Sequence, residues 1–149
     1  MLYVDTSVIV KLYIKEECSL EVSQWIRRNN EAIPLTRFHE LEFTNAIYLK
    51  QFRAEMTNEQ VLLVLSKFDE HLRRGVYYRP QINWTDVINF AFDLSQSHTK
   101  TTGTRSLDTL HVASALALEA NRFLTLDQRQ SELAELAGLT IIPLLNQNT

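Results

Sequence analysis

The sequence predicts an α/β protein in which a mainly parallel sheet of about five strands is flanked by about seven helices. Short apolar runs rich in branched and aromatic residues alternate with segments of helix length. Only three glycines and three prolines occur, so long stretches lack helix breakers. The length of 149 residues, with 45% hydrophobic and 22% charged residues, is typical of one globular domain spanning the whole chain, 1–149.

The expected elements follow in order along the chain. Branched and aromatic residues predict strands over 2–4, 32–35, 76–79, 122–126 and 140–144. The segments between them are expected to be helices over 7–14, 19–29, 37–53, 58–74, 84–97, 107–121 and 128–137. Ligands of such parallel sheets bind outside the carboxyl ends of the strands, so functional residues are expected at that edge.

Composition excludes several classes of function. With 15 Lys and Arg against 18 Asp and Glu, the net charge of −3 provides no bulk positive field for nonspecific binding of nucleic acid or an anionic membrane. The single cysteine, Cys18, excludes an internal disulfide, and with four histidines it argues against a Cys/His zinc site. The chain shows neither a signal-peptide pattern nor about 20 consecutive apolar residues. A reducing, cytoplasmic setting without a membrane partner is therefore expected.

Two aspartates follow predicted strands. Asp5 ends the first strand and Asp127 ends the fourth, so both side chains are expected at the same edge of the sheet. An aspartate between a strand and a helix is also a frequent N-cap, and the spacing of Asp127 and Gln130 resembles a capping box. Capping therefore stays open for both residues, although Thr6 or Ser7 could replace Asp5 in that role.

Asp108 lies one turn into a helix whose apolar residues point to every side. Such a helix is expected to be largely buried, and a buried acid is costly without compensation. The helix dipole could compensate partly and would require no function of Asp108. His111 lies three residues further on, and we interpret it as a core histidine that is hydrogen-bonded to the Asp108 carboxylate.

The segment 37–53 contains two glutamates that helical geometry separates. At about 100° per residue, one inward stripe contains Asn45 near its centre and Glu42 at its margin. The apolar members of this stripe are Phe38, Leu41, Leu49 and Phe52. Glu40 points to the other side and is expected to be solvated. Glu42 therefore becomes the fourth candidate acid, with pairing to a nearby arginine as the alternative.

Four carboxylates at positions 5, 42, 108 and 127 would repel one another strongly unless a cation or raised pKa values relieved them. Oxygen ligands without cysteine favour Mg²⁺ or Mn²⁺, and hydrolysis of a phosphodiester is a reaction that such ions support. Lys100 and Arg105 lie in the acid-free segment 97–106, which leads to Asp108. We expect both to contact substrate phosphate, with an ordinary surface loop as the alternative.

These residues resemble a family, the PIN-domain ribonucleases, and within it the VapC-like toxins of type II toxin-antitoxin systems. The likeness spans most of the chain and rests on Val4-Asp5-Thr6-Ser7, Glu42-x-x-Asn45-Ala46, Asp108-Thr-Leu-His-Val-Ala-Ser-Ala115 and Leu124-Thr125-x-Asp127, in this order. The resemblance implies a PIN-like three-layer sandwich and a metal-dependent endoribonuclease that cleaves RNA. It also implies a homodimer, or a higher assembly, inhibited by a cognate antitoxin.

The resemblance also implies roles for individual residues. The acidic, metal-binding and catalytic cluster is Asp5, Glu42, Asp108 and Asp127, and its polar supports are Asn45 and either Ser7 or Thr6. We also expect His111 and Thr125 to support this site. The metal, held by Asp5 and Asp108 with help from Glu42, would activate a water for attack on the phosphodiester. Asp127 is the least secure ligand, because family members differ in how much they need the last acid.

Two other functions stay open at this point. Asp5 at a strand end would suit an aspartyl phosphatase, although that chemistry commonly pairs acids two residues apart and position 7 is a serine. Alternatively, the acids only cap helices and the protein is a non-catalytic binding module. The resemblance leads us to expect an antitoxin segment on Phe43, Ile47 and 61–68, for which simple core packing is the alternative.

Overall fold

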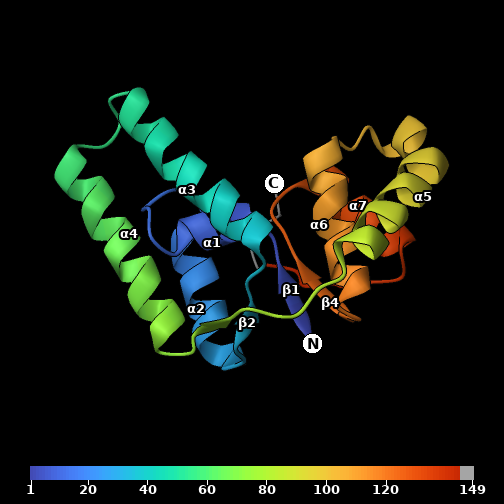
Figure 1. Ribbon diagram of the computed structural model, residues 1–149, viewed down its shortest axis with the longest axis horizontal. Coiled ribbons are helices and arrows are strands. Elements are labelled where there is room, and N and C mark those ends of the chain that lie inside the picture. Colours follow the sequence, from blue (N-terminus) through green and yellow to red (C-terminus); the bar gives the residue numbers. More distant parts are fainter. Residues whose placement is uncertain (145–149) are drawn as a thin grey trace. The chain divides into compact units, whose positions relative to one another are not determined.

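The computed structural model describes residues 1–144, which form two compact units. The first contains Met1–Asp5 and Pro80–Pro143, and the second contains Thr6–Arg79 together with Leu144. Figure 1 traces both units along the chain. Residues 145–149 lie outside the described residues, and the expectation of one domain over 1–149 stays a prediction.

The first unit is built on a three-stranded parallel sheet in the order β1-β4-β5. Leu2 lies opposite Arg122 and Val4 opposite Leu124, and Arg122 in turn lies opposite Thr140. Its elements are β1 (Leu2–Val4), α5 (Trp84–Thr102), α6 (Ser106–Ala117), β4 (Arg122–Leu124), α7 (Gln128–Leu136) and β5 (Thr140–Ile141). The carboxyl ends of β1 and β4 therefore coincide.

The core of the first unit forms because small residues of α6 allow close packing. Val112, Ala113 and Ala115 are fully buried. The Tyr3 ring of β1 stacks on the Phe123 ring of β4, with 5.5 Å between ring centroids. The sequence-based expectation that α6 is buried on most sides is confirmed, because the continuous run 111–115 is buried.

The second unit pairs a two-stranded parallel sheet, β2-β3, with four helices. Its elements are α1 (Thr6–Lys11), α2 (Ser19–Asn29), β2 (Ile33–Pro34), α3 (Arg37–Phe52), α4 (Asn58–Arg73) and β3 (Tyr77–Tyr78). Thr36 and Thr57 begin α3 and α4 with capping boxes, in which the threonine hydroxyl accepts the backbone N–H three residues on. These caps fix where both helices begin.

The expected α/β class is confirmed, and two details differ. Within residues 1–144 the structure has seven helices and five strands. All strand pairs are parallel, but the strands divide into two sheets. Helix α5 continues to Thr102, so residues 97–102 are helical and only a short segment remains of the expected loop. Gly103 ends the helix in the left-handed conformation, at φ 65°. No helix in this part of the chain is long and apolar enough to cross a bilayer.

The predicted inward stripe of α3 is wrong. The buried residues of this helix are His39, Phe43 and Ile47, whereas Leu41 is 67% exposed and Phe52 is 86% exposed. Phe43 is drawn inward by aromatic packing, because its ring stacks on Phe68 of α4 at 4.1 Å. The stripe that the sequence analysis expected to be buried therefore lies on the opposite, exposed face of the helix.

The predicted antitoxin surface is exposed only in part. Phe43 and Ile47 are fully buried, and Val61, Val64 and Phe68 of the segment 61–68 also lie in the core, whereas Leu62 and Leu63 are 57% and 55% exposed. Simple core packing accounts for the five buried residues, as the alternative interpretation held.

The corrected phase of α3 predicts opposite outcomes for two phenylalanines. Replacing Phe43 with Ala should lower the free energy of unfolding by about 3 to 5 kcal/mol, because it removes a buried ring from the core. Replacing Phe52 with Ala should change it by less than about 0.5 kcal/mol, because that ring is exposed. Denaturant unfolding of both variants measures the difference, and equal losses would contradict the observed phase.

Candidate functional site

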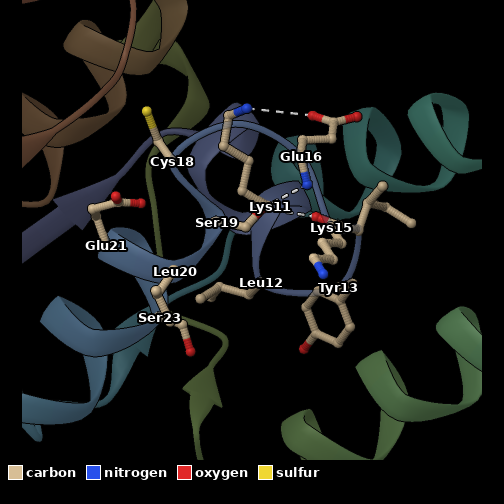
Figure 2. Close-up of a pocket in the computed structure, with 11 residues that line it drawn as sticks. Lys11, Leu12, Tyr13, Lys15, Glu16, Cys18, Ser19, Leu20, Glu21 and Ser23 are labelled. Carbon is tan, nitrogen blue, oxygen red and sulfur yellow. Dashed lines mark hydrogen bonds and ion pairs between the residues drawn. The ribbon is translucent and has the colours of Figure 1, made fainter. Parts of the chain in front are cut away.

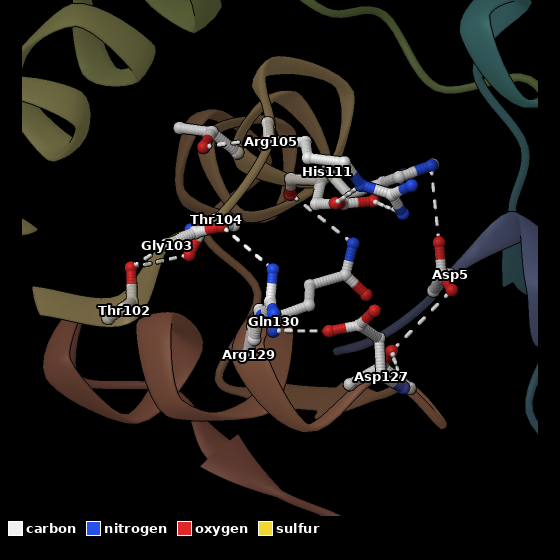
Figure 3. A network of polar contacts seen from close by, with 12 residues as sticks. Asp5, Thr102, Gly103, Thr104, Arg105, His111, Asp127, Arg129 and Gln130 are labelled. Atoms are coloured by element: carbon white, nitrogen blue, oxygen red, sulfur yellow. Dashed lines mark hydrogen bonds and ion pairs between the residues drawn. The ribbon is translucent and has the colours of Figure 1, made fainter. Parts of the chain in front are cut away.

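Three of the four predicted acids belong to the first unit. Asp5 directly follows β1, Asp127 follows β4 after a two-residue link, and Asp108 lies in the first turn of α6. The Asp5 backbone N–H donates to the Leu124 carbonyl at 2.9 Å, which extends the parallel pairing of the two strands. The polar residues at this end of the sheet form the network that Figure 3 shows.

Asp5 is the most buried of these acids, with 6% of its surface exposed. His111 Nε2 lies 3.2 Å from Asp5 Oδ1, and Thr125 Oγ1 lies 3.5 Å from Oδ2. The other ring nitrogen of His111, Nδ1, lies 3.0 Å from the Tyr3 hydroxyl. His111 is therefore the expected core histidine, but the carboxylate that it contacts is Asp5, whereas the sequence analysis named Asp108.

Asp108 is paired with Arg105 at the start of α6. Arg105 Nε donates to Asp108 Oδ2 at 2.9 Å, and Nη2 donates to Oδ1 at 3.5 Å. This carboxylate raises the pKa of the Arg105 guanidinium, chiefly through the hydrogen bond. Arg105 was expected to contact substrate phosphate, but the structure places it on a predicted metal ligand. Lys100 lies exposed in the last turn of α5.

Asp127 caps helix α7. Its Oδ1 accepts the backbone N–H of Gln130 at 2.9 Å, and its own backbone N–H donates to Thr125 Oγ1 at 3.1 Å. The capping alternative for Asp127 therefore describes a contact that the structure contains. A cap uses one carboxylate oxygen and does not by itself prevent the other from binding a ligand.

Gln130 is a residue that the sequence analysis treated only as part of a capping box. Its side chain is 1% exposed, and Nε2 donates to the Asp108 backbone carbonyl at 3.3 Å. Its Oε1 has no hydrogen-bond partner within residues 1–144. A buried amide oxygen of this kind is costly without a partner, and it can coordinate a hard cation or accept a hydrogen bond from a water bound to one.

The donor set of this unit suits Mg²⁺ or Mn²⁺ by its chemistry. Carboxylates, a threonine hydroxyl and the Gln130 amide oxygen are hard oxygen donors. In the described chain, however, no group of three or more His, Cys, Asp or Glu side chains is arranged to hold an ion. Asp108 is paired with Arg105 and Asp127 caps a helix, so an ion would have to take Asp108 from the arginine.

Glu42 belongs to the second unit, where it accepts a hydrogen bond from Thr6 Oγ1 at 2.7 Å. Ser7 and Asn45, the other predicted supports in this unit, are exposed. Glu40 was expected to be solvated, but its carboxylate pairs with Arg37 and with Arg79, the latter at 2.7 Å. The role of Glu42 in the acidic site stays a prediction.

Two cavities differ in what lines them. A cavity of about 380 Å³ in the first unit is lined by Asp108 and Asp127 together with Arg105, Gln128 and Arg129. A second cavity, of about 400 Å³, lies at the loop between α1 and α2 (Figure 2). There Lys11 pairs with Glu16 at 3.3 Å, and we assign no chemistry to that loop. The cavity in the first unit is lined by both acidic and basic side chains, as we expect of a site that binds a metal ion and a phosphate.

Comparisons with known proteins give a likeness of fold. No family model and no curated protein sequence matches the chain. FitAcB from Neisseria gonorrhoeae is 15% identical and similar over 96% of this chain and 97% of that chain, with a TM-score of 0.65. VapBC2 from Rickettsia felis bound to a DNA fragment from their promoter is 15% identical over 95% and 98% of the two chains, with a TM-score of 0.63. PAE2754 from Pyrobaculum aerophilum is 15% identical over 94% and 89%, with a TM-score of 0.56.

These matches confirm the predicted PIN-like α/β fold. They also correct the sequence analysis, because the assignment of the chain to the VapC-like PIN-domain ribonucleases is wrong as a statement of family: no family model matches. The motifs behind that assignment are short, and at least one of them has a structural cause, since Asp127 caps a helix. The likeness that stands is one of fold.

The two roles of Asp127 can be separated by a pair of substitutions. Asp127→Ala should lower the free energy of unfolding by about 1 kcal/mol, and Asp127→Asn should leave it nearly unchanged, because asparagine caps a helix as well as aspartate does. If Asp127 is also a ligand, both variants should bind Mn²⁺ more weakly than the parent. Denaturant unfolding measures the first effect and Mn²⁺ titration the second. If Asp127→Asn binds Mn²⁺ with the affinity of the parent, helix capping is the only role of Asp127 that remains.

Proposed function

We propose that this protein is a metal-dependent endoribonuclease that acts as the toxin of a toxin-antitoxin pair. The observation that carries the proposal is Asp5, a buried carboxylate held by His111 at the end of β1, in the same unit as Asp108 and Asp127. Ligands of parallel sheets bind outside the carboxyl ends of the strands, and carboxylate oxygens are ligands that hard cations prefer. The PIN-like fold supports the same chemistry, and RNA as substrate is the part of the proposal that the cleavage assay below tests.

Asp5 and Asp108 would hold Mg²⁺ or Mn²⁺ with help from Glu42 and Asp127. When bound, such an ion lowers the pKa of a water molecule and neutralises charge on the scissile phosphate. In the chain itself, His111 and Thr125 contact the two oxygens of the Asp5 carboxylate. Arg105 and Arg129 at the cavity, with Lys100 of α5, would bind the flanking phosphates of the substrate.

A protein partner is part of the proposal. Two structures with a similar fold are FitAcB and VapBC2, and the second was solved with a DNA fragment from their promoter. We infer a cognate antitoxin for this chain, and a homodimer or a higher assembly with that antitoxin. Helix α3 also exposes apolar side chains that a partner could cover, namely Leu41, Tyr48, Leu49 and Phe52.

One observation favours a non-catalytic binding module as the second candidate function. Asp108 is paired with Arg105 and Asp127 caps α7, so two of the three aspartates of the first unit have structural partners. In that case the acids stabilise the fold and the protein acts by association alone. The two candidates differ in whether Mn²⁺ binds and whether RNA is cleaved.

The nuclease proposal predicts a metal-dependent loss of RNA in the test tube. Protein stripped with EDTA should be inactive and should cleave RNA when Mn²⁺ is added. Asp5→Asn should reduce the cleavage rate by about 100-fold or more, the scale of losing a group that stabilises charge in the transition state. Glu42→Gln should have a similar effect, and a gel assay with labelled RNA measures both.

Glu40→Gln is the matched control on the same helix and should stay within a few-fold of the parent. Equal losses in the Glu40 and Glu42 variants, on equally folded protein, would remove Glu42 from the site. Hydrolysis of a small phosphate ester without RNA cleavage would instead indicate a phosphatase. If neither substrate is cleaved, with or without Mn²⁺, the non-catalytic binding module would be the remaining candidate function.

The Arg105–Asp108 pair predicts opposite effects on metal and on RNA. Arg105→Gln should strengthen Mn²⁺ binding by about two- to fivefold, because the ion no longer competes with an exposed ion pair. The same variant should weaken RNA binding and reduce its salt dependence by about one released counterion. Lys100→Ala is the control and should affect only RNA. Unchanged Mn²⁺ affinity in the Arg105 variant would show that the ion does not use Asp108.

A further inference from the structure

A buried series of hydrogen-bonded groups connects Tyr3, His111 and Asp5 in the first unit. The Tyr3 hydroxyl lies 3.0 Å from His111 Nδ1, and His111 Nε2 lies 3.2 Å from Asp5 Oδ1. Tyr3 is 0% exposed, His111 2% and Asp5 6%. Figure 3 shows His111 and Asp5 joined at one side of the acidic network. The series thus links the most buried acid of the site to the core of the unit.

The chemistry of the three groups gives this series a direction. A carboxylate can only accept, so Nε2–H of His111 donates to Asp5. A neutral imidazole that donates at Nε2 must accept at Nδ1, so the Tyr3 hydroxyl donates to the ring. Tyr3 therefore selects the tautomer that points a proton at Asp5.

The residues around Tyr3 and His111 hold these hydrogen-bonded groups in place. Tyr3 and Asp5 are two residues apart, so their side chains leave the strand on the same face. The Tyr3 ring is fixed by its stack on Phe123, with only 8° between the ring planes. It meets His111 edge-on, with ring centroids 5.9 Å apart. His111 is therefore packed on one side by the ring whose hydroxyl it binds.

We propose that His111, oriented by Tyr3, is a positioning residue that aims the Asp5 carboxylate at a divalent cation. This inference rests on the function proposed above and assigns to His111, which was expected only as a support of the site, an action that passes through Asp5. Partners that hydrogen-bond to a ligand side chain fix its orientation, and their loss typically weakens metal binding. The contact of His111 with Asp5, at 3.2 Å, is shorter than that of Thr125, at 3.5 Å, which makes His111 the stronger of these two supports.

The test measures Mn²⁺ affinity in the absence of RNA. His111→Leu should raise the Kd for Mn²⁺ by about 10- to 100-fold, because it removes the donor to Asp5. His111→Gln should recover most of the affinity, because its amide nitrogen can donate in the place of Nε2. Val112→Ala is the matched control: it opens the core beside His111 and lowers the melting temperature, but should leave the Kd unchanged. Titration by electron paramagnetic resonance reports the Mn²⁺ that remains unbound.

Tyr3→Phe tests the second link. It should raise the Kd for Mn²⁺ less than His111→Leu does, and it should add nothing to the effect of His111→Leu in the double variant, because the ring that it orients is gone. Nitrogen-15 correlation spectra of metal-free protein should show the Nε2–H tautomer of His111 in the parent and a loss of that preference in Tyr3→Phe.

The outcomes distinguish this inference from the proposed function. Parental protein that binds no Mn²⁺ would overturn the metal-dependent function and the inference with it. Parental protein that binds Mn²⁺, together with a His111→Leu variant of equal affinity, would overturn only the inference. A His111→Gln variant as weak as His111→Leu, or additive effects of the two substitutions, would likewise show that His111 and Tyr3 serve only packing.

Discussion

The parallel pairing of β1 with β4 is the contact on which the site of the first unit depends. Because the two strands run in the same direction and in register, Asp5 and Thr125 emerge at the same end. The hydrogen bond from the Asp5 N–H to the Leu124 carbonyl continues that register to the last residue. Asp127 follows two residues later as the cap of α7, so one pairing of three residues places two acids and their threonine support.

Each of the three aspartates has its own compensation for negative charge. Asp5 accepts from a buried histidine, Asp108 pairs with an exposed arginine, and Asp127 accepts a backbone N–H at a helix start. Carboxylates compensated one by one need no shared ion for the chain to fold. The three aspartates therefore share one unit although, within residues 1–144, no group of three His, Cys, Asp or Glu side chains is arranged to hold an ion.

The sequence predicted the features that follow from local chemistry. The elements, the parallel strands and the cap at Asp127 could be predicted because branched residues, breakers and the Asp-x-x-Gln spacing act locally. The phase of α3 could not, because Leu41 and Phe52 are as apolar as Phe43 and Ile47, and only the partner ring of Phe68 decides which face is buried. The partner of His111 was missed because helical spacing favours Asp108, while strand periodicity links Tyr3 with Asp5.

The supports of Asp5 and Asp108 differ in kind, and this difference bears on how a site can bind and release an ion. Asp5 is held through His111 and Tyr3, whose ring stacks in the core, so its orientation changes only if the core changes. Asp108 is held by Arg105, whose side chain is 77% exposed and can rotate into solvent at little cost. A rigid carboxylate can select geometry, and a releasable one can adjust to an arriving ion. The first unit combines both kinds of support, so a cation that bound there would meet one carboxylate already oriented and one that must first leave its arginine.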